Sequence, residues 1–197
     1  MKTHRAGSGI LAIALSGVLV VSGCASATWI NTAISDIPVV LQIVTSILSI
    51  VAVAEGKGQA DPAMIAEVKN IAAQATNDLT TVQKLINDYK VAAAADKPSV
   101  LAKIDAALTA AQKDLQGVLA SFHVKDTATQ TAISVGMGLA VTTVEAIISL
   151  LPPAPSPAMP AARTARRAPP HKPDKPEDLK TKYNAIVSSD FPDAVIH

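Results

Sequence analysis

Apolar residues recur every three or four positions along residues 28–151, which is the spacing of one face of an α-helix. The pattern is clearest over 61–89 and 98–122, where one narrow apolar stripe alternates with charged and amide side chains on the other faces. Each stripe predicts an amphipathic helix, and the short connection between the two predicts a helical hairpin. The stripe residues are Ile65, Val68, Ala72, Ala75, Leu79, Val82, Ile86 and Tyr89, followed by Leu101, Ile104, Leu108, Ala111, Leu115, Val118 and Phe122.

Two further helices are expected at 28–54 and 126–151, and both are apolar nearly all round. Residues 37–54 and 127–144 contain no Asp, Glu, Lys or Arg. A helix of this kind is either a buried core helix or a membrane segment. The order along the chain is therefore apolar, amphipathic, amphipathic, apolar, which predicts an all-α antiparallel bundle of four helices.

Several residues punctuate these helices. Asp61, which precedes a proline, is the expected N-cap of the second helix, and either Asp126 or Thr127 is the expected N-cap of the fourth. Pro38 either kinks the first helix or marks its true start. Gly136 and Gly138 weaken the fourth helix and favour close approach of a neighbouring backbone.

Most of the 13 prolines fall after residue 151 and divide the chain. The bundle is expected over 24–151, and a Pro/Ala/Arg-rich linker over 152–176. A short amphipathic C-terminal helix and a tail follow at 177–197, with 189–197 expected to be loose. The linker is basic, so an anionic lipid or envelope polymer is a possible contact for it, although a solvated spacer is the simpler reading.

Composition narrows the function classes. Aromatic residues make up only 3% of the chain and the formal net charge is +1, so neither base stacking nor a strong positive field favours nucleic acid. The four histidines, His4, His123, His171 and His197, include no pair at helical spacing and no carboxylate–histidine motif. The sequence therefore predicts no metal site, no cofactor and no enzyme activity. His123 is expected to sit at a helix C-terminus, where a positive charge is favourable.

The N-terminus carries the most specific motif. Lys2 and Arg5 precede an uncharged apolar segment, 9–21, which ends in Val21-Ser22-Gly23-Cys24. This arrangement has the three parts of a secretory signal and resembles the lipobox of a bacterial lipoprotein signal peptide.

The resemblance implies cleavage between Gly23 and Cys24, removal of residues 1–23, and acylation of Cys24, the only cysteine. Acyl chains such as palmitate would then anchor the protein to the cell membrane or outer membrane, facing the periplasm or exterior. The residue after the cysteine is Ala25 and not aspartate, which in enterobacterial relatives favours the outer membrane. A plain signal peptide cleaved near Ala25 or Ala27, or an uncleaved N-terminal anchor, remains the alternative.

Two side chains, Trp29 and Glu145, each allow two interpretations of their position. Trp29 lies five residues after Cys24 and suits either a membrane-interface contact or the protein core. Glu145, alone on an apolar helix, is either a surface residue or a polar contact inside the bundle or membrane.

The sequence thus predicts a lipid-anchored helical protein of the bacterial cell envelope with a non-catalytic structural, scaffold or protein-interaction role. A protein partner or self-association is expected through the heptad faces. One alternative is a membrane-inserting hairpin or pore-like protein that uses helices 28–54 and 126–151. A further alternative is a carrier of an apolar ligand, although alanine-rich seams leave little internal space for one.

Overall fold

The computed structural model describes residues 22–153 and 174–197, with side chains from Thr28 onward. Over these ranges the chain forms five α-helices, one short 3-10 helix and no strand, so the prediction of an all-α fold is confirmed. The predicted signal peptide, apart from Ser22 and Gly23, and most of the predicted linker lie outside the described residues. The elements are α1 (Ser22–Gly56), α2 (Pro62–Val91), α3 (Lys97–Ser121), α4 (Thr127–Leu150), α5 (Pro176–Val187) and the 3-10 helix η1 (Pro192–Ala194).

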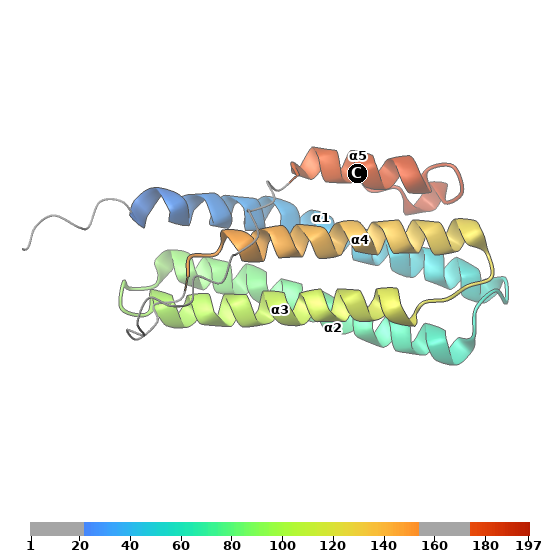
Figure 1. The fold of residues 1–197 in the computed structure, drawn as a ribbon, viewed down its shortest axis with the longest axis horizontal. Coiled ribbons are helices and arrows are strands. Elements are labelled where there is room, and N and C mark those ends of the chain that lie inside the picture. Colours follow the sequence, from blue (N-terminus) through green and yellow to red (C-terminus); the bar gives the residue numbers. More distant parts are fainter. Residues whose placement is uncertain (1–21, 154–173) are drawn as a thin grey trace, which may run out of the picture.

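The helices are arranged in three tiers (Figure 1). Helices α2 and α3 lie side by side in one tier, and the two apolar helices α1 and α4 lie side by side in the next. The short helix α5 lies on the far side of that second tier and contacts both α4 and α1. The two apolar helices are therefore enclosed between two amphipathic elements.

The apolar stripes of α2 and α3 face the interior as predicted. All eight stripe residues of α2 and all seven of α3 and its cap are buried. At one end of the pair the backbone N–H of His123 donates to the sulfur of Met64, 3.2 Å away. At the other end the Lys97 ammonium lies 5.2 Å from the centroid of the Tyr89 ring. The end of α3 thus lies beside the start of α2, and the start of α3 beside the end of α2.

Asp61 is the N-cap of α2, as predicted, and Asp126, not Thr127, is the N-cap of α4. The Asp61 carboxylate accepts a hydrogen bond from the backbone N–H of Ala63 at 2.7 Å. The Asp126 carboxylate accepts from the N–H of Thr129 at 2.8 Å and from its hydroxyl at 2.6 Å. These bonds satisfy donors that the first helical turn leaves without an internal partner.

Helix α1 starts earlier than predicted. Its backbone is helical from Ser22, six residues before the expected Thr28, and it passes through Pro38 without ending. Pro38 is therefore inside the helix, and the alternative that it marks the helix start was wrong. Its ring is on an exposed face, where the missing backbone donor removes one bond of the helical ladder but causes no clash with a neighbouring helix.

The C-terminal segment is ordered against the bundle, so the prediction of a loose tail over 189–197 was wrong. Ala194 and Ile196 are 4% and 7% exposed. The Asn184 amide donates to the carbonyl of Ile196 at 2.8 Å, and the Ile196 N–H donates to the Asn184 carbonyl oxygen at 2.9 Å. This reciprocal pair ties the last residues to α5, a side chain–backbone contact that hydrophobic periodicity does not reveal.

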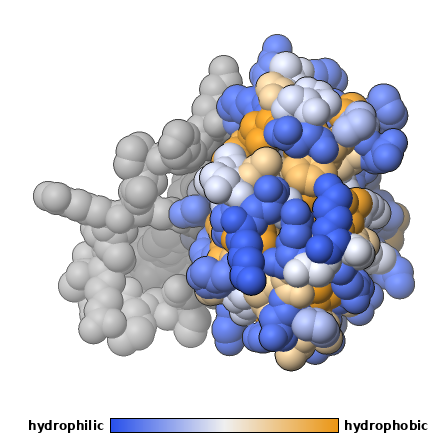
Figure 2. Space-filling view, turned by 90° about the vertical axis from the view of Figure 1, so that its right-hand side faces the viewer, coloured by the Kyte–Doolittle hydropathy of each residue, from blue (hydrophilic) through white to orange (hydrophobic). Residues whose placement is uncertain are grey.

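The surface at one end of the long axis is mainly hydrophilic, with hydrophobic residues visible only between polar ones (Figure 2). Among the described residues, the large apolar side chains that are clearly exposed are scattered: Ile34, Val53, Val91 and Val135.

Candidate functional site

Two buried polar residues of α1, Ser46 and Asp36, lie near the place where α5 and the C-terminal residues pack on α1 and α4. We call this contact the α5 interface. From α5 it buries the apolar side chains that the sequence places on one side of the C-terminal helix, namely Leu179, Tyr183 and Val187. Of that predicted face, Ile186 is only partly buried. The C-terminal helix thus covers part of the chain's own apolar helices.

Tyr183 is the centre of the α5 interface. Its side chain is completely buried, and its hydroxyl donates to the Ser46 hydroxyl oxygen at 2.7 Å. Ser46 in turn donates to the backbone carbonyl of Ala194. Burial raises the pKa of the Tyr183 phenol above its ordinary value, and the bond with Ser46 acts in the opposite direction. This chain of hydroxyls links α5, α1 and the C-terminal segment.

Gly136 makes room for that tyrosine. A Cβ atom at this position would lie 2.8 Å from Cε2 of Tyr183 and 2.9 Å from Cδ1 of Ile47. A Cβ at Gly138, two residues later, would meet nothing within 4 Å. The groups that approach Gly136 closely are therefore the side chains of Tyr183 and Ile47, and not the neighbouring backbone that was expected.

Asp36 is the other polar residue buried near this interface, and sequence reasoning missed it. Its side chain is 1% exposed, although it is the one charged residue of 28–54. The Ser35 hydroxyl donates to Oδ1 at 2.9 Å, whereas Oδ2 has no hydrogen-bond partner. Burial, with added repulsion from Asp174 and Glu177, raises the pKa of Asp36 from 3.8 to about 6. A lone acid in a long apolar run is the signal that could have identified it.

A groove lies beside the interface, between α1 and the chain's last residues. Its volume is about 430 Å³. The lining from α1 is largely polar, and the opposite wall is the segment 193–197. The α1 residues are Leu41, Gln42, Thr45, Ser46 and Ser49. The opposite wall contributes the side chains of Asp193 and His197 to this mixed lining.

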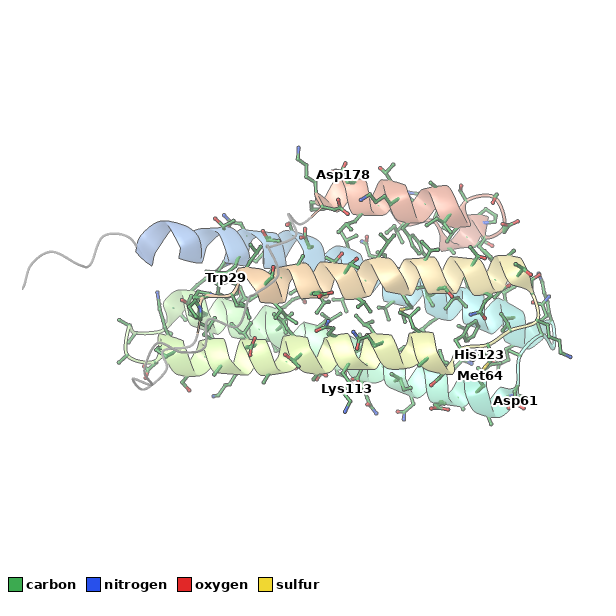
Figure 3. The ribbon with its side chains drawn as sticks, viewed as in Figure 1. Trp29, Asp61, Met64, Lys113, His123 and Asp178 are labelled. Carbon is green, nitrogen blue, oxygen red and sulfur yellow. The ribbon has the colours of Figure 1, made fainter. Side chains whose placement is uncertain are left out.

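Trp29 lies at the other end of the bundle (Figure 3). Its side chain is completely buried, and its ring meets that of Tyr89 edge to face at a centroid distance of 5.3 Å. The indole N–H has no hydrogen-bond partner within the described structure. Of the two readings of Trp29, this burial favours the core position.

The remaining site residues do not come together. Gly23 and Cys24 lie in the first turn of α1, where the structure describes the backbone alone. Glu145 is exposed on α4, and His123 is exposed just after the end of α3. In the part of the chain with described side chains, no three His, Cys, Asp or Glu residues form a group able to hold a metal ion.

Two helical stretches, Thr28–Gly56 and Thr127–Leu150, are long and apolar enough to cross a membrane. About half of the most apolar window of each is buried inside the protein, 56% and 44% respectively. Length and composition alone do not separate a membrane span from a core helix, so the nature of the outward residues becomes decisive. Comparison with protein-family models, curated proteins and solved structures finds no match for this chain.

Proposed function

We propose that this chain is a lipid-anchored helical protein of the bacterial cell envelope, with a non-catalytic structural, scaffold or protein-interaction role. In this proposal Cys24 holds the protein on the membrane. Helices α1 to α4 form an antiparallel four-helix bundle outside the bilayer, and α5 closes its outer side.

The observation that carries the proposal is the character of the outward face of α1. Side chains that face away from the bundle on a membrane span meet lipid and are normally large and apolar. Here the exposed positions of α1 recur every three or four residues and are mostly small or polar. Only Ile34 and Val53 are large and apolar, and the other exposed positions over 28–54 are Thr28, Asn31, Ser35, Pro38, Gln42, Thr45, Ser49 and Ala52. This face favours water, so α1 behaves as the core helix of a bundle.

Helix α4 supports the same conclusion. Its exposed residues include Thr131, Thr142 and the charged Glu145, against a single large apolar one, Val135. A charge on the outer face of a span near the bilayer centre costs about 2.5 to 3.5 kcal/mol on insertion scales, whereas it costs little in water.

The anchor rests on the motif Val21-Ser22-Gly23-Cys24. Each buried methylene of an acyl chain adds about 0.8 kcal/mol of membrane affinity, so two or more chains on one cysteine hold a protein stably.

The stripes of α2 and α3 are buried within the chain, so a protein partner would meet the outer faces of the bundle and not the heptad seams.

Mass spectrometry of the full chain recovered from bacterial membranes tests the anchor. The proposal requires a mature chain that begins at Cys24 and carries acyl groups on it. The matched variant Cys24→Ser must lose the acyl mass and the membrane retention while the bundle still folds. A mature chain that begins after Ala25 or Ala27, or an uncleaved chain with a free Cys24 thiol, would refute the lipoprotein reading.

One observation favours a second candidate, insertion of α1 and α4 into a bilayer. Ile34 and Val53 of α1 and Val135 of α4 are 42%, 44% and 39% exposed, on two helices that are otherwise long enough to span. Insertion would require α5 and the α2–α3 pair to separate from them. Protection of α1 from a water-soluble label, seen in vesicles and absent in buffer, would support this candidate over the first.

A further inference from the structure

Asp36 is buried in a setting that suits its neutral form. Its carboxyl is 1% exposed and receives one hydrogen bond, from Ser35 to Oδ1 at 2.9 Å. Oδ2 is equally buried and receives none from the described residues. An ionised carboxylate in this position lacks the partners that normally compensate the loss of hydration, and a protonated one loses much less.

The start of α5 adds negative charge to this setting. Among the described residues, Asp174, just before α5, and Glu177, in its first turn, are the charged groups that act on Asp36, and both disfavour its ionised form. Asp174 forms an ion pair with Lys182, whose ammonium is 2.5 Å from the carboxylate, and solvent weakens this pair because both side chains are partly exposed.

Among the described residues, neither α1 nor α4 has a positively charged side chain that would compensate an ionised Asp36. Helix α1 has no second charged residue over 28–54. Helix α4, which also packs on α1 and α5, has Glu145 as its one charged residue, and Glu145 is exposed. The α5 interface thus places Asp174 and Glu177, and no positive charge from α5, among the groups that influence Asp36.

We infer that Asp36 and the acidic start of α5 form a latch that responds to pH, holding α5 on α1 and α4 when Asp36 is protonated and loosening it when Asp36 is ionised. Release would withdraw Tyr183 from Ser46 and Gly136 and would uncover apolar surface on both helices. This device is independent of the anchor and of the role proposed above.

The direction of the effect follows from proton linkage. The pKa of Asp36 is raised from 3.8 to about 6 when α5 is docked, by burial first and by repulsion from Asp174 and Glu177. Docking therefore favours the protonated form, and its contribution is complete below pH 3.8 and decreases as the pH rises toward 6. Above about pH 6 the docked state buries a charge that the released state exposes to water.

Hydrogen exchange of the full chain in mild detergent tests the latch. Protection of the α5 amides, corrected for the intrinsic effect of pH on exchange, is measured at about pH 5 and about pH 8. We expect α5 to lose roughly tenfold or more in protection between these values, while α2 and α3 change little. The variant Asp36→Asn keeps an oxygen for Ser35 and cannot ionise, so its α5 protection should change by less than about twofold.

Two further variants keep the test decisive. Glu177→Gln, at an exposed position, removes repulsion and should reduce the pH effect even if Asp36→Asn fails to fold. His197→Gln removes the histidine at the end of the chain, beside α5, and should leave the effect unchanged. Equal α5 protection at both pH values would overturn the proposal, as would a full pH effect in Asp36→Asn. An undiminished effect in Glu177→Gln, or its loss in His197→Gln, would assign the response to another group and would also overturn it.

Discussion

The ring of Tyr183 in α5 lies directly against the backbone of Gly136 in α4, so close that a Cβ on Gly136 would be 2.8 Å from Cε2 of the ring. This contact joins the C-terminal helix to an apolar helix at a point that only glycine allows. Tyr183 cannot easily turn aside, because its hydroxyl is held by Ser46 and its ring is completely buried.

Gly136→Ala is therefore expected to destabilise the protein despite the better helix propensity of alanine. The new methyl group must displace Tyr183 and the end of the Ile47 side chain, and overpacking of this kind costs about 1 to 3 kcal/mol. Chemical denaturation monitored by circular dichroism measures the loss. The matched variant Gly138→Ala, which has open space around it, should gain up to about 1 kcal/mol from helix propensity. Equal effects of the two substitutions would contradict the position assigned to Tyr183.

Removing the hydroxyl of Ser46 should cost more than removing that of Tyr183. Tyr183→Phe deletes one donor and leaves Ser46 bonded to the Ala194 carbonyl, for a loss of about 1 kcal/mol. Ser46→Ala leaves both a buried phenol and a buried carbonyl without that partner, for about 2 to 3 kcal/mol. Thr45→Ala, at an exposed neighbour that bonds within its own helix, is the control and should change stability little. A smaller effect for Ser46→Ala than for Tyr183→Phe would show that the hydroxyl chain is absent.

Asp126 should stabilise the start of α4 when its carboxylate is ionised, and this stabilisation should be lost in acid. Hydrogen bonds from Thr129 lower the pKa of Asp126, so the ionised form is the one the fold prefers. The contribution is thus present at neutral pH and is lost as the pH falls through the lowered pKa. Thermal melting of Asp126→Ala should show a lower Tm than the unchanged chain at neutral pH, with the difference shrinking in strong acid. A constant difference across the whole range would argue against the cap.

Trp29 provides an intrinsic probe, because it is the one tryptophan of the chain. Its burial against Tyr89 predicts emission at shorter wavelength than an exposed indole and weak quenching by acrylamide, with both changing on unfolding. For the lipidated protein on vesicles, brominated lipids should leave the emission largely unchanged. Strong quenching by those lipids would place Trp29 at the membrane interface after all.

The α2–α3 pair was predictable from the sequence almost residue by residue. Each stripe has one periodicity, and local chemistry such as the Asp61 cap agrees with it, so little depends on distant contacts. The predicted start of α1 was less accurate, because residues 22–28 are small and carry no apolar stripe that would mark them as helical.

The α5 interface could not be predicted in the same way. Leu179 and Tyr183 mark an apolar face, but periodicity does not say whether that face meets another protein or the same chain. The answer depends on the fit of the Tyr183 ring against Gly136 and on the hydrogen bond between Tyr183 and Ser46. The two bonded residues are 137 positions apart in the sequence. Asp36 was missed for the same reason, since its burial results from packing between elements distant in sequence.

The proposed function requires that α1 and α4 are core helices and not membrane spans. Sedimentation velocity on residues 25–197, which lack the signal and Cys24, tests it in buffer without detergent. We expect a soluble, helical monomer or small oligomer, because the bundle and α5 enclose the apolar surfaces. Aggregation that detergent reverses would contradict this account and would show that these helices require lipid.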